Sequence, residues 1–181
     1  MEANEAHELH EHAEHGAQDP SLRPVAFTMS VLAVLVAITT VLGHRVHTEA
    51  LLYQNKATDM WNEYQAQKIR STDTGNTADL MNVLTVADKD KAAAKLKGYA
   101  DHQAKWNDDF AKDQDKAKEF EKRVEEAEVR GTRFDLAETM LEIGLVVTSV
   151  TLLTRRRTYW ILGLIFAAGG IVSALSVALL R

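Results

Sequence analysis

Hydrophobic residues gather into three blocks of this chain, and a long polar stretch separates the first block from the other two. The first block, residues 25–43, carries no charge and is long enough, at about 1.5 Å per residue, to cross a bilayer core. The other two blocks, 134–154 and 158–180, are separated by the arginine triplet 155–157. Because arginine is costly in hydrocarbon, the triplet predicts a water-facing turn. The pattern therefore predicts an all-α integral membrane protein with three transmembrane helices.

The first block has one competing interpretation, a cleaved signal peptide. The segment before it is poor in Lys and Arg, and no A-x-A cleavage pattern follows it. We therefore predict a retained signal-anchor helix over residues 25–43.

The polar stretch, residues 44–133, repeats apolar residues at alternating steps of four and three, as a coiled coil does. A second seam over residues 92–127 includes Trp106, Phe110 and Phe120, which we interpret as helix-pair core rather than as a ligand-binding box. We predict an extramembrane coiled-coil insert. The first seam consists of Val46, Ala50, Tyr53, Ala57, Met60 and Tyr64.

Several features interrupt the insert. Gln103 and Asp113 replace apolar residues in the second seam, a device that fixes helix register. Residues 71–77, STDTGNT, predict a break, because a Gly-Asn pair favours a turn, and a short helix is expected near Leu80–Ala87. The seams on the two sides differ in length, roughly 25 against 36 residues, so a simple hairpin leaves an overhang. The short helix or partner subunits would cover it, and because exposed apolar patches mark interfaces, we expect a homo-oligomer or a subunit of a membrane complex.

The N-terminal segment, residues 1–24, is an acidic, histidine-rich tail. It has almost nothing to bury, which is typical of a solvated tail or a frayed helix. Neutral imidazoles also bind Zn, Ni or Cu, so the tail is a candidate metal site with the ligands His7, His10, His12 and His15.

Two carboxylates, Glu138 and Glu142, stand near the start of the second span, one helical turn apart and with Thr139 beside the first. Carboxylates inside a membrane are candidates for a functional site. Both, however, lie within about two turns of the start of the span, where they reach headgroups and water. Two interpretations follow: an ion or proton conduit using Glu142, or a headgroup anchor.

The last span contains a ridge of small residues, Gly170, Ala174 and Ala178, which Gly169 and Ser173 widen. Small residues let helix backbones approach closely in lipid. We predict that this ridge packs against another helix, which the sequence does not identify.

Charge, composition and the absence of catalytic motifs argue against several classes of function. The net charge of −5 argues against nucleic acid as a partner, and the absence of cysteine excludes disulfides and thiolate metal sites. The sequence has no Ser-His-Asp, Cys-His, P-loop or H-E-x-x-H arrangement. We therefore expect no enzymatic activity and no cofactor.

The run ATDMWNEYQAQKIR, residues 57–70, resembles the bacterial domain of unknown function 4337 family. The plan of one N-terminal span, a charged helical insert and a C-terminal pair of spans is similar too, so the resemblance covers nearly the whole chain. It implies a multi-pass protein of the bacterial cytoplasmic (inner) membrane. It carries no activity, cofactor or catalytic residue to transfer.

The positive-inside rule places the short arginine turn in the cytoplasm, and hence the insert in the periplasm and the tail in the cytoplasm. Arg45, Arg130, Arg133 and Arg181 favour the opposite orientation, but long loops weigh less under this rule. The expected function is a non-catalytic oligomeric membrane scaffold or accessory subunit with the insert as its interaction surface. The alternatives are a small ion or proton conduit using Glu142 and a metal-responsive sensor using the tail.

Overall fold

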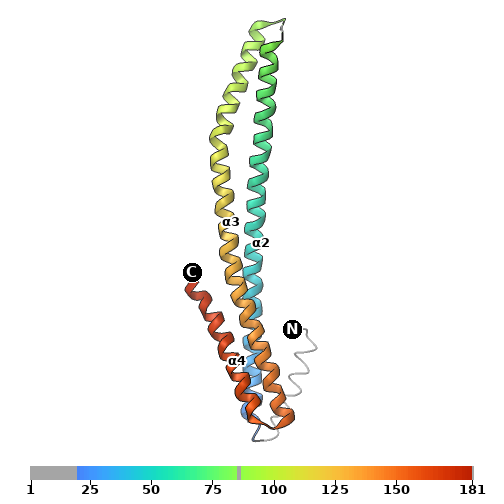
Figure 1. Cartoon of the computed structure of the whole chain (residues 1–181), viewed down its shortest axis with the longest axis vertical. Coiled ribbons are helices and arrows are strands. Elements are labelled where there is room, and N and C mark those ends of the chain that lie inside the picture. The colour runs from blue at the N-terminus through green and yellow to red at the C-terminus, as the bar shows by residue number, and fades with distance from the viewer. Residues whose placement is uncertain (1–19, 85–86, 181) are drawn as a thin grey trace. The chain divides into compact units, whose positions relative to one another are not determined.

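Three long helices make up the part of the chain that the structure describes. The computed structural model describes residues 20–84 and 87–180, with residues 178 and 180 described by their backbone alone. Its elements are α2 (Arg23–Val83), α3 (Lys89–Thr154), α4 (Arg157–Ser176) and the short 3₁₀ helix η1 (Val177–Leu180) (Figure 1). The all-α class is confirmed, and all three long helices are long and apolar enough to cross a membrane.

The predicted break at residues 71–77 is wrong, because α2 continues as an α-helix through this stretch. The Thr72 and Thr77 hydroxyls donate to carbonyls four residues earlier, at 2.9 and 2.7 Å, as helical residues do. Gly75 faces α3, where Gln103 would lie 3.0 Å from an added Cβ. Packing against a neighbouring helix therefore outweighs the weak local turn preference of Gly and Asn.

The predicted short helix near Leu80–Ala87 is also corrected. Residues Leu80 to Val83 form the last turn of α2, while residues 85 and 86 lie outside the described part of the chain. The longer α2 removes the predicted overhang, since it provides a partner helix as far as the region of Gln103. Unequal seam lengths therefore give no reason to expect an oligomer.

The chain folds as two compact units, and each has a core of its own. The paired-helix unit is Ala50–Glu125 and consists of the second half of α2 and the first half of α3. The three-helix unit comprises the described residues before Ala50 and after Glu125. The predicted boundary near residue 133 between the insert and the second span is not a helix end, because α3 runs unbroken from Lys89 to Thr154.

The arginine triplet forms the turn that the sequence predicts. Helix α3 ends at Thr154 and α4 begins at Arg157. Arg155 adopts a φ of 55°, in the left-handed region, and its N–H donates to the Thr151 carbonyl at 2.8 Å. This conformation ends α3, so the chain reverses within two residues.

The core of the three-helix unit is apolar and draws on all three helices. Its fully buried residues are Met29, Leu32 and Val36 of α2, Leu141 and Leu145 of α3, and Ala167 of α4. Figure 1 shows α4 running beside α2 and α3 over this part of the chain. The Trp160 indole N–H donates to the Thr28 hydroxyl at 3.2 Å, which ties the start of α4 to the start of α2.

The paired-helix unit is an antiparallel pair with an aromatic and alanine core. Tyr53 stacks on Phe120 with ring centroids 6.3 Å apart, while Tyr64, further along α2, meets Phe110, earlier in α3, at 5.6 Å. The partners of successive α2 residues therefore lie at successively earlier positions of α3, as they must in an antiparallel pair. Fully buried alanines, including Ala117, let the helices approach between the rings. These contacts lie on the two seams that the heptad spacing predicts.

Asp88 caps the start of α3. The Lys91 backbone N–H donates to Asp88 Oδ1 at 3.1 Å, and the Lys91 ammonium lies 3.1 Å from Oδ2. These two contacts, the backbone hydrogen bond first, lower the pKa of Asp88. Because the folded pKa lies below the unfolded value of about 3.9, the cap contributes stability above that value and loses it as the pH falls through the folded pKa.

We expect Asp88→Ala to speed hydrogen exchange of the Lys91 amide at neutral pH, because the amide loses its acceptor. Asp88→Asn is the matched control: asparagine also caps helices, so protection remains but no longer depends on acid pH. Amide exchange measured by NMR at pH 7 and pH 3 checks both variants. Equal exchange in wild type and Asp88→Ala would show that the cap does not form.

Candidate functional site

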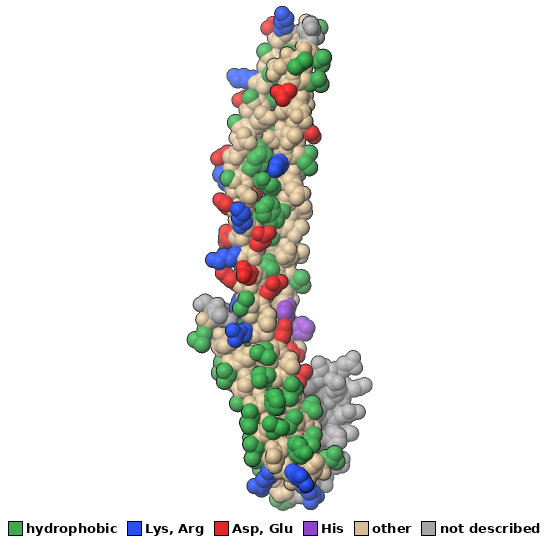
Figure 2. All heavy atoms as spheres, in the orientation of Figure 1, with side chains coloured by type: hydrophobic (Ala, Val, Ile, Leu, Met, Phe, Trp, Pro, Cys, Tyr) green, Lys and Arg blue, Asp and Glu red, His purple; other side chains and the backbone are tan. Residues whose placement is uncertain are grey.

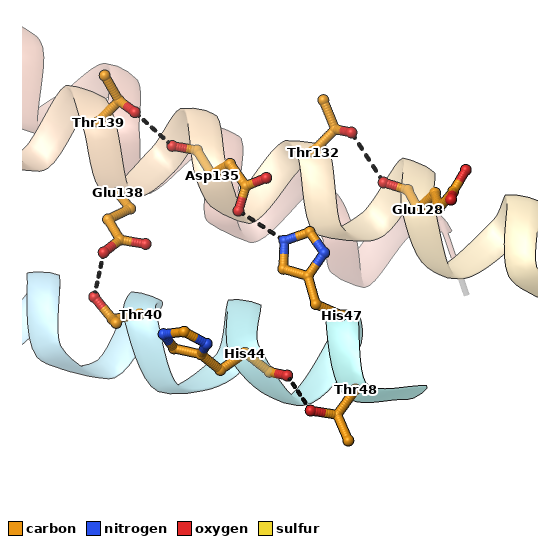
Figure 3. A network of polar contacts seen from close by, with 9 residues as sticks. All are labelled: Thr40, His44, His47, Thr48, Glu128, Thr132, Asp135, Glu138 and Thr139. Carbon is orange, nitrogen blue, oxygen red and sulfur yellow. Dashed lines mark hydrogen bonds and ion pairs between the residues drawn. The ribbon is translucent and has the colours of Figure 1, made fainter. Parts of the chain in front are cut away.

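A belt of polar contacts joins α2 to α3 within the three-helix unit (Figure 3). The Thr40 hydroxyl lies 2.6 Å from Glu138 Oε1, and His47 Nε2 lies 3.0 Å from Asp135 Oδ1. We call this set of six residues the polar belt: Thr40, His47, Glu49, Arg130, Asp135 and Glu138. Its third pair is an ion pair, in which Arg130 Nη2 donates to Glu49 Oε2 at 3.2 Å. The three pairs fix the register of α2 against α3 at the end of the apolar stretch.

Gly131 makes room for the His47 ring of the belt. A Cβ added at Gly131 would lie 2.8 Å from Cε1 of His47 and 3.2 Å from Nδ1. The imidazole therefore lies directly against the α3 backbone, one turn from its partner Asp135. Residue spacing alone does not single out His47, Asp135 or Gly131, because their relation depends on which residues of α2 and α3 meet.

Glu138 and Glu142, the two carboxylates singled out from the sequence, have different surroundings. Glu138 is half-buried and accepts from Thr40, so it belongs to the polar belt. Glu142 is half-buried one turn further along α3, and within residues 20–84 and 87–180 no donor lies at hydrogen-bonding distance from it. Thr139, the predicted neighbour, donates to the Asp135 carbonyl at 2.8 Å instead.

A conduit through the middle of the three-helix unit would meet its apolar core. Leu141 and Leu145, on either side of Glu142 in sequence, are 1% exposed, as is Val36 on α2. Thr148 and Thr151 of α3 are buried further along the helix, and the Thr148 hydroxyl donates to the Gly144 carbonyl at 2.7 Å. The buried hydroxyls are thus separated from the polar belt by tightly packed hydrocarbon.

Small residues bring α4 against α3, and Gly170 of the predicted ridge is one of them. A Cβ on Gly163 would lie 2.7 Å from the Gly144 carbonyl oxygen, and one on Gly170 would lie 2.8 Å from the Ala137 carbonyl oxygen. The helix that receives the ridge is therefore α3, the neighbour in sequence. The buried face of α4 consists of Gly163, Ala167, Gly170 and Ser173.

The predicted ridge residues take different positions around α4. Ala174 is half-buried, Gly169 faces the flexible end of Met140, and the side chain of Ala178 lies outside the described residues. Ser173 donates to the Arg133 carbonyl at 2.9 Å. The face of α4 that contacts α3 therefore includes Gly163 and Ala167. The predicted ridge, which takes every fourth residue from Gly170, does not include these two positions.

The three aromatic residues of the second seam serve different contacts. Phe110 and Phe120 pack on Tyr64 and Tyr53 of α2, whereas Trp106 stacks on His102 of its own helix at 5.7 Å. They are spread along α3 and do not converge on one space. Phe110 and Phe120 therefore lie in the contact between α2 and α3, whereas the ring contact of Trp106 is within α3.

The polar residues that interrupt the second seam have partners across the pair. Gln103 Nε2 donates to the Ser71 carbonyl at 3.2 Å, and Gln67 Nε2 donates to Asp113 Oδ2 at 3.0 Å. Asp113 is 6% exposed, so moving it by one heptad would leave a buried carboxylate without this donor. The expectation that these residues fix register therefore has a physical basis.

The metal-binding hypothesis falls on His7, His10, His12 and His15, which lie outside the described residues. Within the described ranges, no group of three or more His, Asp or Glu side chains is arranged to hold a metal ion. The His and carboxylate side chains of the polar belt make pairwise contacts between α2 and α3.

Comparison with known proteins identifies one family. The family model described as "Domain of unknown function (DUF4337)" matches residues 21–180. No curated protein and no solved structure matches the chain. The family resemblance drawn from residues 57–70 is confirmed.

Proposed function

Because the chain belongs to the DUF4337 family, whose description assigns no activity, we propose its function from its physical features. We infer a non-catalytic, oligomeric scaffold or accessory subunit of a larger assembly in the bacterial cytoplasmic membrane. The three-helix unit would be the membrane anchor, and the paired-helix unit the extramembrane coiled coil that binds itself or a partner.

The observation that carries the proposal is the apolar exterior of the three-helix unit. Its exterior exposes large apolar side chains, such as Phe27 at 72% and Ile165 at 63%, although its core is apolar too. A water-soluble bundle covers such a core with mostly polar side chains. Figure 2 shows the hydrophobic side chains spread over the face of this unit that is in view. Hydrocarbon is the solvent that suits such a surface.

Charges and aromatic rings at one end of the unit support an orientation. Arg156 and Arg157 are exposed at the α3–α4 turn, next to Tyr159 and Trp160. Aromatic rings favour the membrane–water interface, and short arginine-rich turns favour the cytoplasm. We therefore propose that the turn is cytoplasmic and that the paired-helix unit is periplasmic.

The paired-helix unit offers a surface for a partner. Its outer faces carry isolated large apolar side chains among charged ones, including Leu51 at 65%, Ile69 at 61% and Val83 at 84% exposed. Its aromatic core, by contrast, is used in packing α2 on α3. The exposed apolar residues, rather than Trp106, Phe110 or Phe120, are the positions at which a partner would gain by burying surface.

Membrane extraction and mass measurement test this proposal. We expect the full chain to stay in the membrane fraction through alkaline carbonate washing, and to have a mass in detergent that is a multiple of its 20.1 kDa. Release by carbonate would contradict a membrane anchor, and a purely monomeric mass without a stoichiometric foreign subunit would contradict the scaffold. Proton or cation flux in liposomes that is lost in Glu142→Gln would favour the conduit instead.

A further inference from the structure

One side of the α2–α3 pair in the three-helix unit is not covered by α4. Around α3, at about 100° per residue, the contacts with α4 fall on Ala137, Met140, Gly144 and Thr148. The contacts with α2 fall on the adjacent arc, at Phe134 and Glu138. The next arc of α3 therefore faces away from α4 and borders α2. We call it, together with the adjoining arc of α2, the open face.

The open face carries more small and polar side chains than the rest of the exterior. Elsewhere α2 exposes large apolar side chains such as Phe27 and Ile38, at 72% and 50%. On the open face α2 presents small residues and one imidazole, and α3 presents polar side chains together with Val146 and Leu153, which are 59% and 88% exposed. The residues of the open face are Ser30, Ala33, Ala37 and His44 of α2, and Asp135, Thr139, Glu142, Val146, Ser149 and Leu153 of α3.

Glu142 makes this face costly to leave in contact with lipid. It has no donor at hydrogen-bonding distance in the described part of the chain. Glu142 lies level with Ala37 along the helix axes, since each is one helical turn from the Thr40–Glu138 pair, on the side away from the polar belt. The nearby hydroxyls are already used: Thr139 donates to the Asp135 carbonyl and Ser30 to the Ala26 carbonyl. Ionisable groups in a span face protein or water rather than lipid.

We propose that the open face is the contact surface between two copies of this chain, related by a two-fold axis along the membrane normal. This inference rests on the proposed membrane scaffold and names its interface. A two-fold contact brings each residue to the same depth in both copies. The small side chains of Ala33 and Ala37 let the backbones approach, as in other small-residue contacts in lipid. The contact then places Glu142 of each copy against protein instead of lipid.

The face is complementary to itself at its polar end. The His44 imidazole is exposed and makes no hydrogen bond or ion pair within the described residues, while Asp135, which lies 3.0 Å from His47, is on the α3 arc of the same face (Figure 3). Two-fold symmetry places the histidine of one copy opposite the Asp135 carboxylate of the other. A foreign helix would have to supply both a donor and an acceptor at matching depths, which a second copy does by symmetry.

Single-cysteine cross-linking in membranes tests the interface, because the chain contains no cysteine of its own. We expect Ala37→Cys and Thr139→Cys to form disulfide-linked dimers on oxidation. Ile165→Cys is the control, since it is 63% exposed on α4 and faces away from the proposed contact. Cross-linking of Ile165→Cys with none at Ala37→Cys would overturn the interface but leave the oligomeric scaffold in place. No cross-linking at any of the three, with a monomeric mass in detergent, would overturn both.

A second pair of variants distinguishes loss of the contact between copies from loss of folding. Ala37→Leu combined with Thr139→Cys is expected to lose most of the cross-linked product, because the larger side chain keeps the backbones apart. Ile38→Leu combined with Thr139→Cys is the matched control and is expected to cross-link as Thr139→Cys alone does. Equal yields from the two double variants would overturn the proposal that Ala37 lies in the contact.

Discussion

Gly163→Ala is expected to separate α4 from α3 and to destabilise the three-helix unit by about 1–3 kcal/mol, the usual cost of overpacking. The added Cβ would meet the Thr148 hydroxyl and, at 2.7 Å, the Gly144 carbonyl oxygen. A backbone oxygen inside a helix cannot turn aside, so the helices must move apart. Thermal unfolding in detergent, followed by the fluorescence of Trp160 near the start of α4, measures the loss.

Two other glycines provide matched controls for this prediction. Gly169→Ala places its Cβ against the flexible end of Met140, which can move, so we expect a smaller loss. Gly98→Ala meets nothing within 4 Å and lies inside α3, so it is expected to stabilise the helix by about 0.5–1 kcal/mol. If Gly163→Ala melts no earlier than Gly169→Ala, the close contact between α3 and α4 is not present.

Phe110→Glu is expected to destabilise the paired-helix unit by about 3 kcal/mol or more, because it places a charge in the seam without a partner. Phe110 meets the Tyr64 ring edge-on at 5.6 Å, and the buried residue nearest to it in sequence, Asp113, is itself a carboxylate. The new charge would therefore face repulsion as well as loss of water. Far-UV circular dichroism during heating reports the loss of helix.

Asn107→Glu is the control for the seam, since Asn107 lies one turn before Phe110 on the exposed side of α3. It introduces the same charge without burying it, and its melting curve is expected to stay within about 0.5 kcal/mol of wild type. A melting curve for Phe110→Glu that matches that of Asn107→Glu would mean that the seam is not a buried contact.

The buried stripe along each helix shows what residue spacing can and cannot predict. On α2, steps of four and three connect Val46 to Tyr64, and every one of these residues is buried or half-buried. The same holds on α3 from Ala92 to Ala127. Spacing of this kind determines which face of a helix is buried, because a heptad repeat keeps one stripe on one side. It does not determine which residue on the partner helix lies opposite.

The sequence by itself determined the helical class, the three apolar blocks, the turn at residues 155–157 and the inward faces of the two seams. Each depends on local composition or on the period of one helix, which are properties of short stretches of chain. The tertiary structure alone decided that α2 continues through residues 71–77, because packing against α3 outweighs a weak turn preference there. It alone brought His47 to Asp135 and Thr40 to Glu138, and left Glu142 on a face that α4 does not cover. These pairings join residues about 90 positions apart, and only the register between two helices, which is set by all of their contacts together, can specify them.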